Sequence, residues 1–172
     1  MITLTGKKVS EGIAIGKLSF FKRDSKEIRR IYVKDVEKEV QRFQKARQKA
    51  LQELKELYDT ASKEVGEANA AIFEMQQMIL EDHDLVDKIT NIIVEHKLNA
   101  EYAIQTAAEE FIATAVVNDK NYVQGHDADV KDVSTRVLRI LSRGFKDKML
   151  MDEPFVLACG ELYSSEAVQL DK

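Results

Sequence analysis

The three histidines are the residues whose side chains could carry acid–base, metal or phosphate chemistry near neutral pH. His83 lies between two aspartates, His126 precedes another aspartate, and His96 follows a glutamate. An imidazole beside a carboxylate can bind a metal ion or act as a general base. The flanking sequence favours a plainer interpretation, with His83 and His96 as solvated helix residues and His126 at a turn or helix start. Histidine catalysis is therefore the minor hypothesis.

A second candidate for function is the segment from Ala70 to Leu85, which carries more apolar side chains than one buried helix face can hide. It lies within residues 64–87, which contain seven acids and no Lys or Arg. An apolar strip with an acidic rim is typical of a docking surface for a basic partner. Met78 and Ile79 fit a buried core as well as they fit such a surface, whereas Phe73 is expected to point inward.

Composition narrows the class of protein. The chain has 172 residues, of which 33% are charged and 44% hydrophobic, and its net charge is −4. It has no apolar run near the roughly 20 residues that span a bilayer, and its first residues do not resemble a signal peptide. Cys159 is the only cysteine, so no internal disulfide can form. We expect a cytoplasmic protein, inserted into no membrane, with no nucleic acid as its main partner.

One long helix is predicted over residues 35–64. Asp35 is a suitable N-cap, and apolar residues recur at alternating spacings of four and three, as in a heptad seam. Arg47 interrupts that seam. Its members are Val36, Val40, Phe43, Arg47, Ala50, Leu54, Leu57 and Ala61.

Further helices follow, and together they predict a bundle over residues 34–144. The Ala70–Leu85 stretch comes after Gly66, and a short helix follows it to near Glu95. Asn99 can cap the next helix, and the last helix carries Val130, Val133, Val137, Leu138 and Leu141. Gly66 and Gly125 are expected to interrupt this helical region, and Gly144 is expected to end it.

The two ends of the chain read as strands. Residues 13–21 and 155–159 are short apolar runs, and the first is rich in β-branched and aromatic residues. If they pair, the bundle is an insertion within one small sheet, although two strands make a poor independent sheet. We therefore predict a mostly α fold, an antiparallel helical bundle (residues 23–145) inserted into a small, incomplete α/β subdomain (residues 1–22 and 146–172).

Four segments, in order along the chain, carry a family resemblance. They are residues 6–16, residues 71–85, residues 127–138 and residues 162–170. In these segments the sequence resembles the N-terminal domain of Enzyme I, the phosphoenolpyruvate-protein phosphotransferase of the bacterial sugar phosphotransferase system. The resemblance implies an α/β subdomain that bears a phosphorylated histidine and a helical subdomain that docks the phosphocarrier HPr.

The same resemblance implies that this chain alone does not transfer phosphate. The family's histidine lies in a Gly-Gly-x-x-Ser-His loop just beyond the segment matched here, and the sequence ends at Lys172, before that loop. The family's barrel that binds phosphoenolpyruvate and magnesium is also outside it. We therefore expect no catalytic residue and no cofactor in this chain, with magnesium needed only by the full-length parent. The expected partners are HPr and the rest of Enzyme I.

Docking residues follow from the resemblance together with the acidic pattern. Two positions depart from the family: Gln76 stands where a histidine is frequent, and Lys131 where an arginine is common. The predicted partner-binding residues are Glu67, Ala71, Glu74, Met75, Met78, Ile79, Asp82, Asp84, Leu85, Ala115 and Val123.

Three alternatives stay open from the sequence. The chain could be a phosphotransfer enzyme that acts through one of its own histidines. It could be an Enzyme I-like domain of a dihydroxyacetone kinase phosphotransfer subunit. It could also be a helical self-association module built on the long heptad-like helix.

Overall fold

Helix α1 (Val36–Val65) is the element against which most of the other helices pack. The computed structural model describes residues 10–21, 27–118, 123–142 and 155–169. Asp35 caps α1 by accepting a 3.0 Å hydrogen bond from the Lys38 N–H, so the predicted start is confirmed. The predicted seam is also confirmed, since α1 buries Phe43, Ala46, Ala50, Leu54, Leu57 and Ala61. Other helices of the same chain cover this seam, so in the part of the chain that the structure describes α1 keeps no exposed heptad face for self-association.

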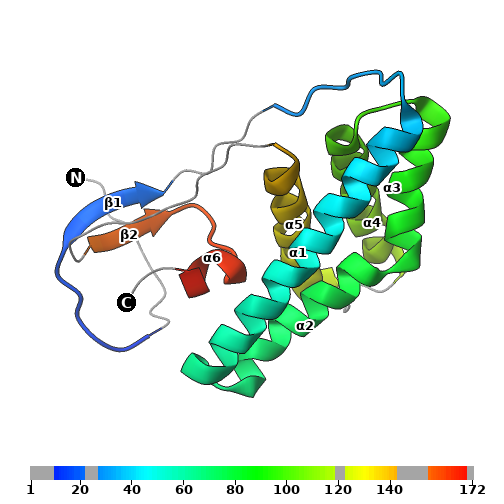
Figure 1. Cartoon of the computed structure of the whole chain (residues 1–172). Coiled ribbons are helices and arrows are strands. Elements are labelled where there is room, and N and C mark those ends of the chain that lie inside the picture. Colours follow the sequence, from blue (N-terminus) through cyan, green and yellow to red (C-terminus); the bar gives the residue numbers. More distant parts are fainter. Residues whose placement is uncertain (1–9, 22–26, 119–122, 143–154, 170–172) are drawn as a thin grey trace.

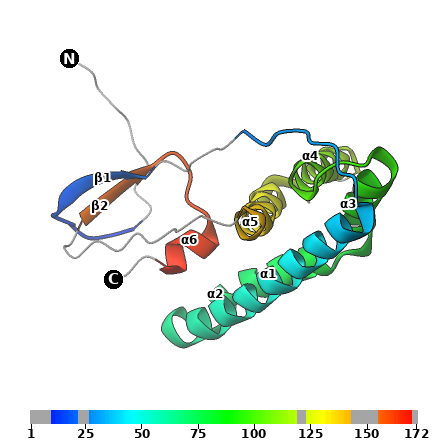
Figure 2. The same cartoon turned by 45° about the horizontal axis from the view of Figure 1, so that its top comes forward.

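A single residue turns the chain from α1 into α2 (Glu67–Glu81). Gly66 ends one helix and begins the next, with φ of 89° and ψ of 159°. That backbone conformation is essentially reserved for glycine. The turn brings α1 and α2 side by side along most of the length of α2 (Figure 2).

Three more helices complete the bundle: α3 (His83–His96), α4 (Ala100–Asn118) and α5 (Val123–Leu141). Helices α3 and α4 pack on each other, α4 packs on α5, and all three contact α1. Their apolar faces close the core with Leu85, Ile89, Ile93, Ala103, Ile104, Ala107, Val133 and Val137.

Two sequence expectations about helix ends are corrected. Asn99 does not cap α4 with its side chain, because its Oδ1 accepts a 3.0 Å hydrogen bond from the Ile31 N–H. The first N–H of α4, from Ala100, donates instead to Glu39 of α1 at 2.7 Å. Gly125 lies within α5 rather than between helices, since helical backbone tolerates glycine at a modest cost.

Strands β1 (Lys17–Phe21) and β2 (Phe155–Cys159) form a two-stranded parallel sheet, in the register Lys17↔Phe155 to Phe21↔Cys159. Parallel strands need a long crossover connection, and here the helical bundle is that connection. The predicted insertion is therefore confirmed. The first strand is shorter than predicted: residues 13–16 precede it, and Ile13 and Ile15 are 92% and 93% exposed.

Helix α6 (Ser164–Gln169) lies between the sheet and the bundle (Figure 1). It follows β2 and packs Val168 against the bundle core. The predicted subdomain boundaries, at residues 22/23 and 145/146, and the predicted stop at Gly144 fall outside the described residues. Within the described ranges, no helix is both long and apolar enough to cross a membrane.

Candidate docking surface

Helix α2 has two opposite faces. Ala70, Phe73 and Leu80 point into the core. The opposite face repeats every three or four residues, and all its members are exposed. At its C-terminal end Met78 is 70% exposed and Met75 is 38% exposed, so two large apolar side chains share this exposed face. We call this exposed face the α2 stripe, and it consists of Glu67, Ala71, Glu74, Met75 and Met78.

The α2–α3 turn continues this surface. Ile79 is partly buried against the core cluster, and Asp84 is exposed in the first turn of α3. The exposed apolar residues at the end of α2 are thus followed, across the turn at Asp82, by an exposed acid in the first turn of α3. The residues alone left Met78 open between core and surface, and the structure places it on the surface.

Leu85 does not belong to this surface. Its side chain is only 3% exposed and packs within the core cluster. The buried apolar side chains of α3, including Leu85, face α1 and α4. The prediction of Leu85 as an accessible docking residue is therefore corrected.

Asp82 has a structural role that the sequence pattern did not reveal. It is both the C-cap of α2 and the N-cap of α3. Its Oδ1 accepts a 3.1 Å hydrogen bond from the Leu85 N–H. A capping carboxylate is fixed by the helix it caps. Asp82 therefore shapes the turn beneath Met78 and Ile79, and replacing it would disturb that turn as well as the surface charge.

Two further predicted contact residues belong to α4 and α5. Ala115 lies in α4 and Val123 begins α5, but their side chains fall outside the described residues.

Tyr58 of α1 is a surface neighbour that the sequence analysis missed. The negative charge of Glu74, with burial and the charge of Glu67, raises the pKa of the Tyr58 phenol above its usual value. Tyr58 therefore lies beside the acidic part of the α2 stripe. Its position next to Leu57 in the α1 seam could have suggested a place at the edge of α2.

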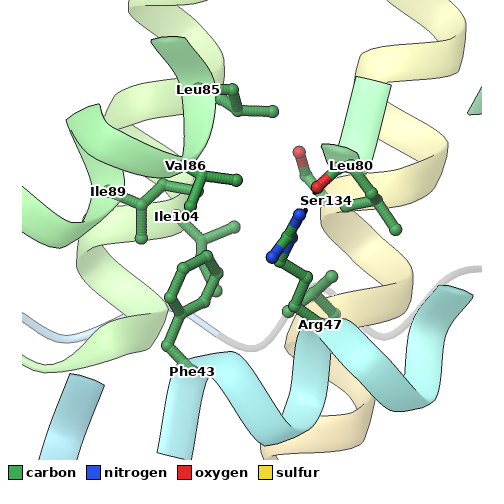
Figure 3. Close-up of a pocket in the computed structure, with 9 residues that line it drawn as sticks. Phe43, Arg47, Leu80, Leu85, Val86, Ile89, Ile104 and Ser134 are labelled. Atoms are coloured by element: carbon green, nitrogen blue, oxygen red, sulfur yellow. Dashed lines mark hydrogen bonds between the residues drawn. The ribbon is translucent and has the colours of Figure 1, made fainter. Parts of the chain in front are cut away.

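A small cavity lies beneath the α2–α3 turn, between α1, α3, α4 and α5 (Figure 3). Arg47 points toward it from α1, and its Nε donates a 2.6 Å hydrogen bond to the Leu80 carbonyl oxygen. Carbonyls in the last turn of a helix have no partner within that helix, so Arg47 supplies one for α2. The cavity is lined mainly by apolar side chains, including Phe43, Leu80, Leu85, Val86, Ile89 and Ile104.

His83 and His96, the two histidines whose side chains the structure describes, lie far apart from each other. His83 and His96 are exposed at the two ends of α3. His126 is in α5, and its side chain lies outside the described residues. Across the part of the chain that the structure describes, no three His, Cys, Asp or Glu side chains are grouped so as to hold a metal ion.

Comparisons with known proteins point to one family. Residues 5–125 match the family described as PEP-utilising enzyme, N-terminal. The phosphoenolpyruvate-protein phosphotransferase of Listeria monocytogenes is 34% identical over 170 residues, which are 98% of this chain and 30% of that protein. The enzyme of the same name from Mycoplasma capricolum is 29% identical over the same shares. The chain thus spans about a third of the length of these relatives.

Solved structures agree with this match. An NMR solution structure of Enzyme I (nEIt) has a TM-score of 0.75 at 26% identity, covering 94% of this chain and 66% of that one. The N-terminal domain of Enzyme 1 - Nitrogen has a TM-score of 0.69 at 20% identity with the same coverage, which supports the fold alone.

Proposed function

The chain belongs to the family of PEP-utilising enzymes through that family's N-terminal domain, and we propose that it is the carrier-docking part of a phosphoenolpyruvate-protein phosphotransferase. Its partner in this proposal is the phosphocarrier HPr of the sugar phosphotransferase system. The observation that carries the proposal is the α2 stripe, where Met78 is exposed to 70% between acidic side chains.

The chemistry of the stripe suits a small basic partner. Met75 and Met78 have flexible thioether side chains that can adapt to a facing surface. Glu67, Glu74 and Asp84 surround them with negative charge, which speeds the encounter with a basic surface and sets its orientation. Ile79 adds partly buried apolar area at the C-terminal end.

The rest of the parent protein is the second partner that we propose. Among the described residues the sheet has two strands. Four apolar side chains on and before β1 are 55% to 93% exposed: Ile13, Ile15, Leu18 and Phe20. Further strands or helices would bury these side chains, as a sheet of this kind requires. Phosphoenolpyruvate and magnesium are assigned to that remaining part.

The proposal places no phosphorylated histidine on this chain. Incubation with phosphoenolpyruvate, magnesium and HPr should leave no acid-labile phosphate on His83, His96 or His126. Phosphate found on any of them would contradict this part of the proposal.

The docking proposal is tested by titrating isotope-labelled chain with the cognate HPr at low and high salt. We expect binding that weakens with salt, because exposed charges are screened. Met78→Ala should weaken binding about tenfold, as expected for a central contact. The double variant Glu74→Lys and Asp84→Lys should mainly slow association and reduce the salt dependence.

A matched control is Val94→Ala, which removes an apolar side chain that is 47% exposed on α3 outside the stripe. It should leave the affinity unchanged. Asp82 is left intact in these variants because it caps α3. An absence of binding at both salt concentrations would overturn the proposal, as would equal losses for Met78→Ala and Val94→Ala.

A further inference from the structure

Gln76 lies on the side of α2 opposite the exposed stripe and is completely buried. Its Nε2 donates two hydrogen bonds to α5, to Asp129 Oδ1 and Asp132 Oδ2, each at 3.1 Å. Asp129 and Asp132 are 6% and 3% exposed. The helix that presents the stripe is therefore fixed to α5 by a polar contact within the core.

The same Asp132 carboxylate also holds α6. Its Oδ1 accepts a 2.6 Å hydrogen bond from the Ser165 hydroxyl, and its Oδ2 accepts a 3.3 Å bond from the Ser165 N–H. Ser165 is 4% exposed. One buried carboxylate thus joins α2, which carries the stripe, to α6, which follows strand β2.

This shared site has little room for independent movement. Asp132 Oδ2 accepts from both Gln76 and Ser165, so any movement of this oxygen affects both bonds. Neighbouring Arg136 donates a 2.8 Å hydrogen bond from its Nη1 to Glu53 Oε2 of α1. Within the described residues, Gln76 Oε1 and Arg136 Nε make no hydrogen bond. Buried polar groups with few alternative partners are costly to disturb, and networks of this kind respond as a unit.

We propose that Gln76, Asp132 and Ser165 form a relay that couples the exposed face of α2 to the position of α6. Displacing α2 moves Gln76, which changes the orientation of the Asp132 carboxylate and loosens its bonds to Ser165. By thermodynamic reciprocity, loosening α6 also loosens α2. The coupling is a property of this chain, and only its use in carrier binding rests on the proposed function.

Native-state amide hydrogen exchange tests the relay within the chain. Gln76→Met keeps the length of the side chain but removes both donated bonds. It should speed exchange of the Glu166 and Ala167 amides, which bond to the Tyr163 carbonyl, about tenfold relative to core amides of α4. Gln77→Met is the matched control, because among the described residues the Gln77 side chain bonds to the Phe73 carbonyl of its own helix and not to α5 or α6.

The reciprocal variant is Ser165→Ala, with the exposed Ser164→Ala as its control. Ser165→Ala should speed exchange in the middle of α2, whereas Ser164→Ala should not. In the double variant of Gln76→Met and Ser165→Ala, the increase in exchange rate should be smaller than the product of the increases in the two single variants. The reason is that both changes remove the same connection.

Multiplicative effects in the double variant would overturn the relay. So would equal exchange rates in α6 for Gln76→Met and Gln77→Met. If either single variant unfolds, the other variant with its own control decides. In a third experiment, HPr is added to the wild-type chain. Binding without any change in the exchange of α6 amides would overturn the use of the relay in docking. An absence of binding would count against the proposed function, and the exchange results of the variants would still test the relay.

Discussion

Arg47 Nε donates a 2.6 Å hydrogen bond to the carbonyl oxygen of Leu80. A charged residue in the middle of the α1 seam thereby holds the last turn of α2, immediately beside Met78 and Ile79. The interruption of the heptad pattern is thus a cap supplied by a neighbouring helix, and it also offers favourable charge to the C-terminal end of the α2 dipole.

Replacing this cap should destabilise the bundle. Arg47→Met preserves the packing of the aliphatic stem but leaves the Leu80 carbonyl without its partner, at a cost of about 2 kcal/mol. Lys45→Met, at an exposed position on the same helix, should change stability by less than about 0.5 kcal/mol. Urea denaturation of both variants checks this, and equal midpoints would show that the Arg47 bond contributes nothing.

Gly66 is expected to resist substitution. At φ of 89° and ψ of 159°, a Cβ is strained even though no other atom lies within 4 Å of it. Gly66→Ala should therefore cost about 1–3 kcal/mol through the backbone alone. Gly160→Ala, where there is equal space, serves as the control in thermal unfolding. An unchanged melting temperature for Gly66→Ala would mean that the turn can adopt another conformation.

The ion pair of Arg42 and Glu101 should make the stability of the fold depend on pH in the acidic range. Burial acts to raise the pKa of Glu101, but hydrogen bonds from Arg42, its own backbone and Asn99 hold it below the ordinary value of 4.5. A lowered pKa gives stabilisation that is present above the ordinary value and lost as pH falls through the folded-state value.

Glu101→Gln should therefore be less stable than wild type at pH 7, by about 1 kcal/mol for a partly exposed pair. The difference should shrink as pH falls below about 4. Glu109→Gln, at an exposed position of α4, should show no such convergence. Denaturation curves across pH check this, and a gap that is constant with pH would contradict it.

The ionisation of Asp132 should change stability with pH in the opposite direction to that of Glu101. Burial raises the pKa of its carboxyl above the ordinary value of 3.8, although hydrogen bonds from Ser165 and the charge of Arg136 oppose the rise. The folded state then binds the proton more tightly than the unfolded state, so this group favours folding as pH falls through its folded-state pKa. Carbon-detected NMR titration of the Asp132 carboxyl would check the direction, and a pKa below 3.8 would show that the hydrogen bonds outweigh burial.

Much of the fold could be predicted from local patterns. The N-cap at Asp35, the α1 seam and the helix break near Gly66 depend on residues close together in sequence, so spacing alone reveals them. The sequence also raised the pairing of residues 13–21 with residues 155–159, because these two segments read as strands. The structure has that pairing, with a shorter first strand over residues 17–21.

The sequence by itself determined the helical bundle, its insertion within a small sheet, and the acidic apolar character of the 70–85 segment. Only the tertiary structure decided which of those apolar residues are exposed, with Met78 outside and Leu85 inside, because that depends on how α1 and α4 cover the turn. It also decided the roles of Arg47, Asp82 and Gln76. Their partners include groups up to 56 residues away, and no periodicity in the sequence specifies contacts between such distant segments.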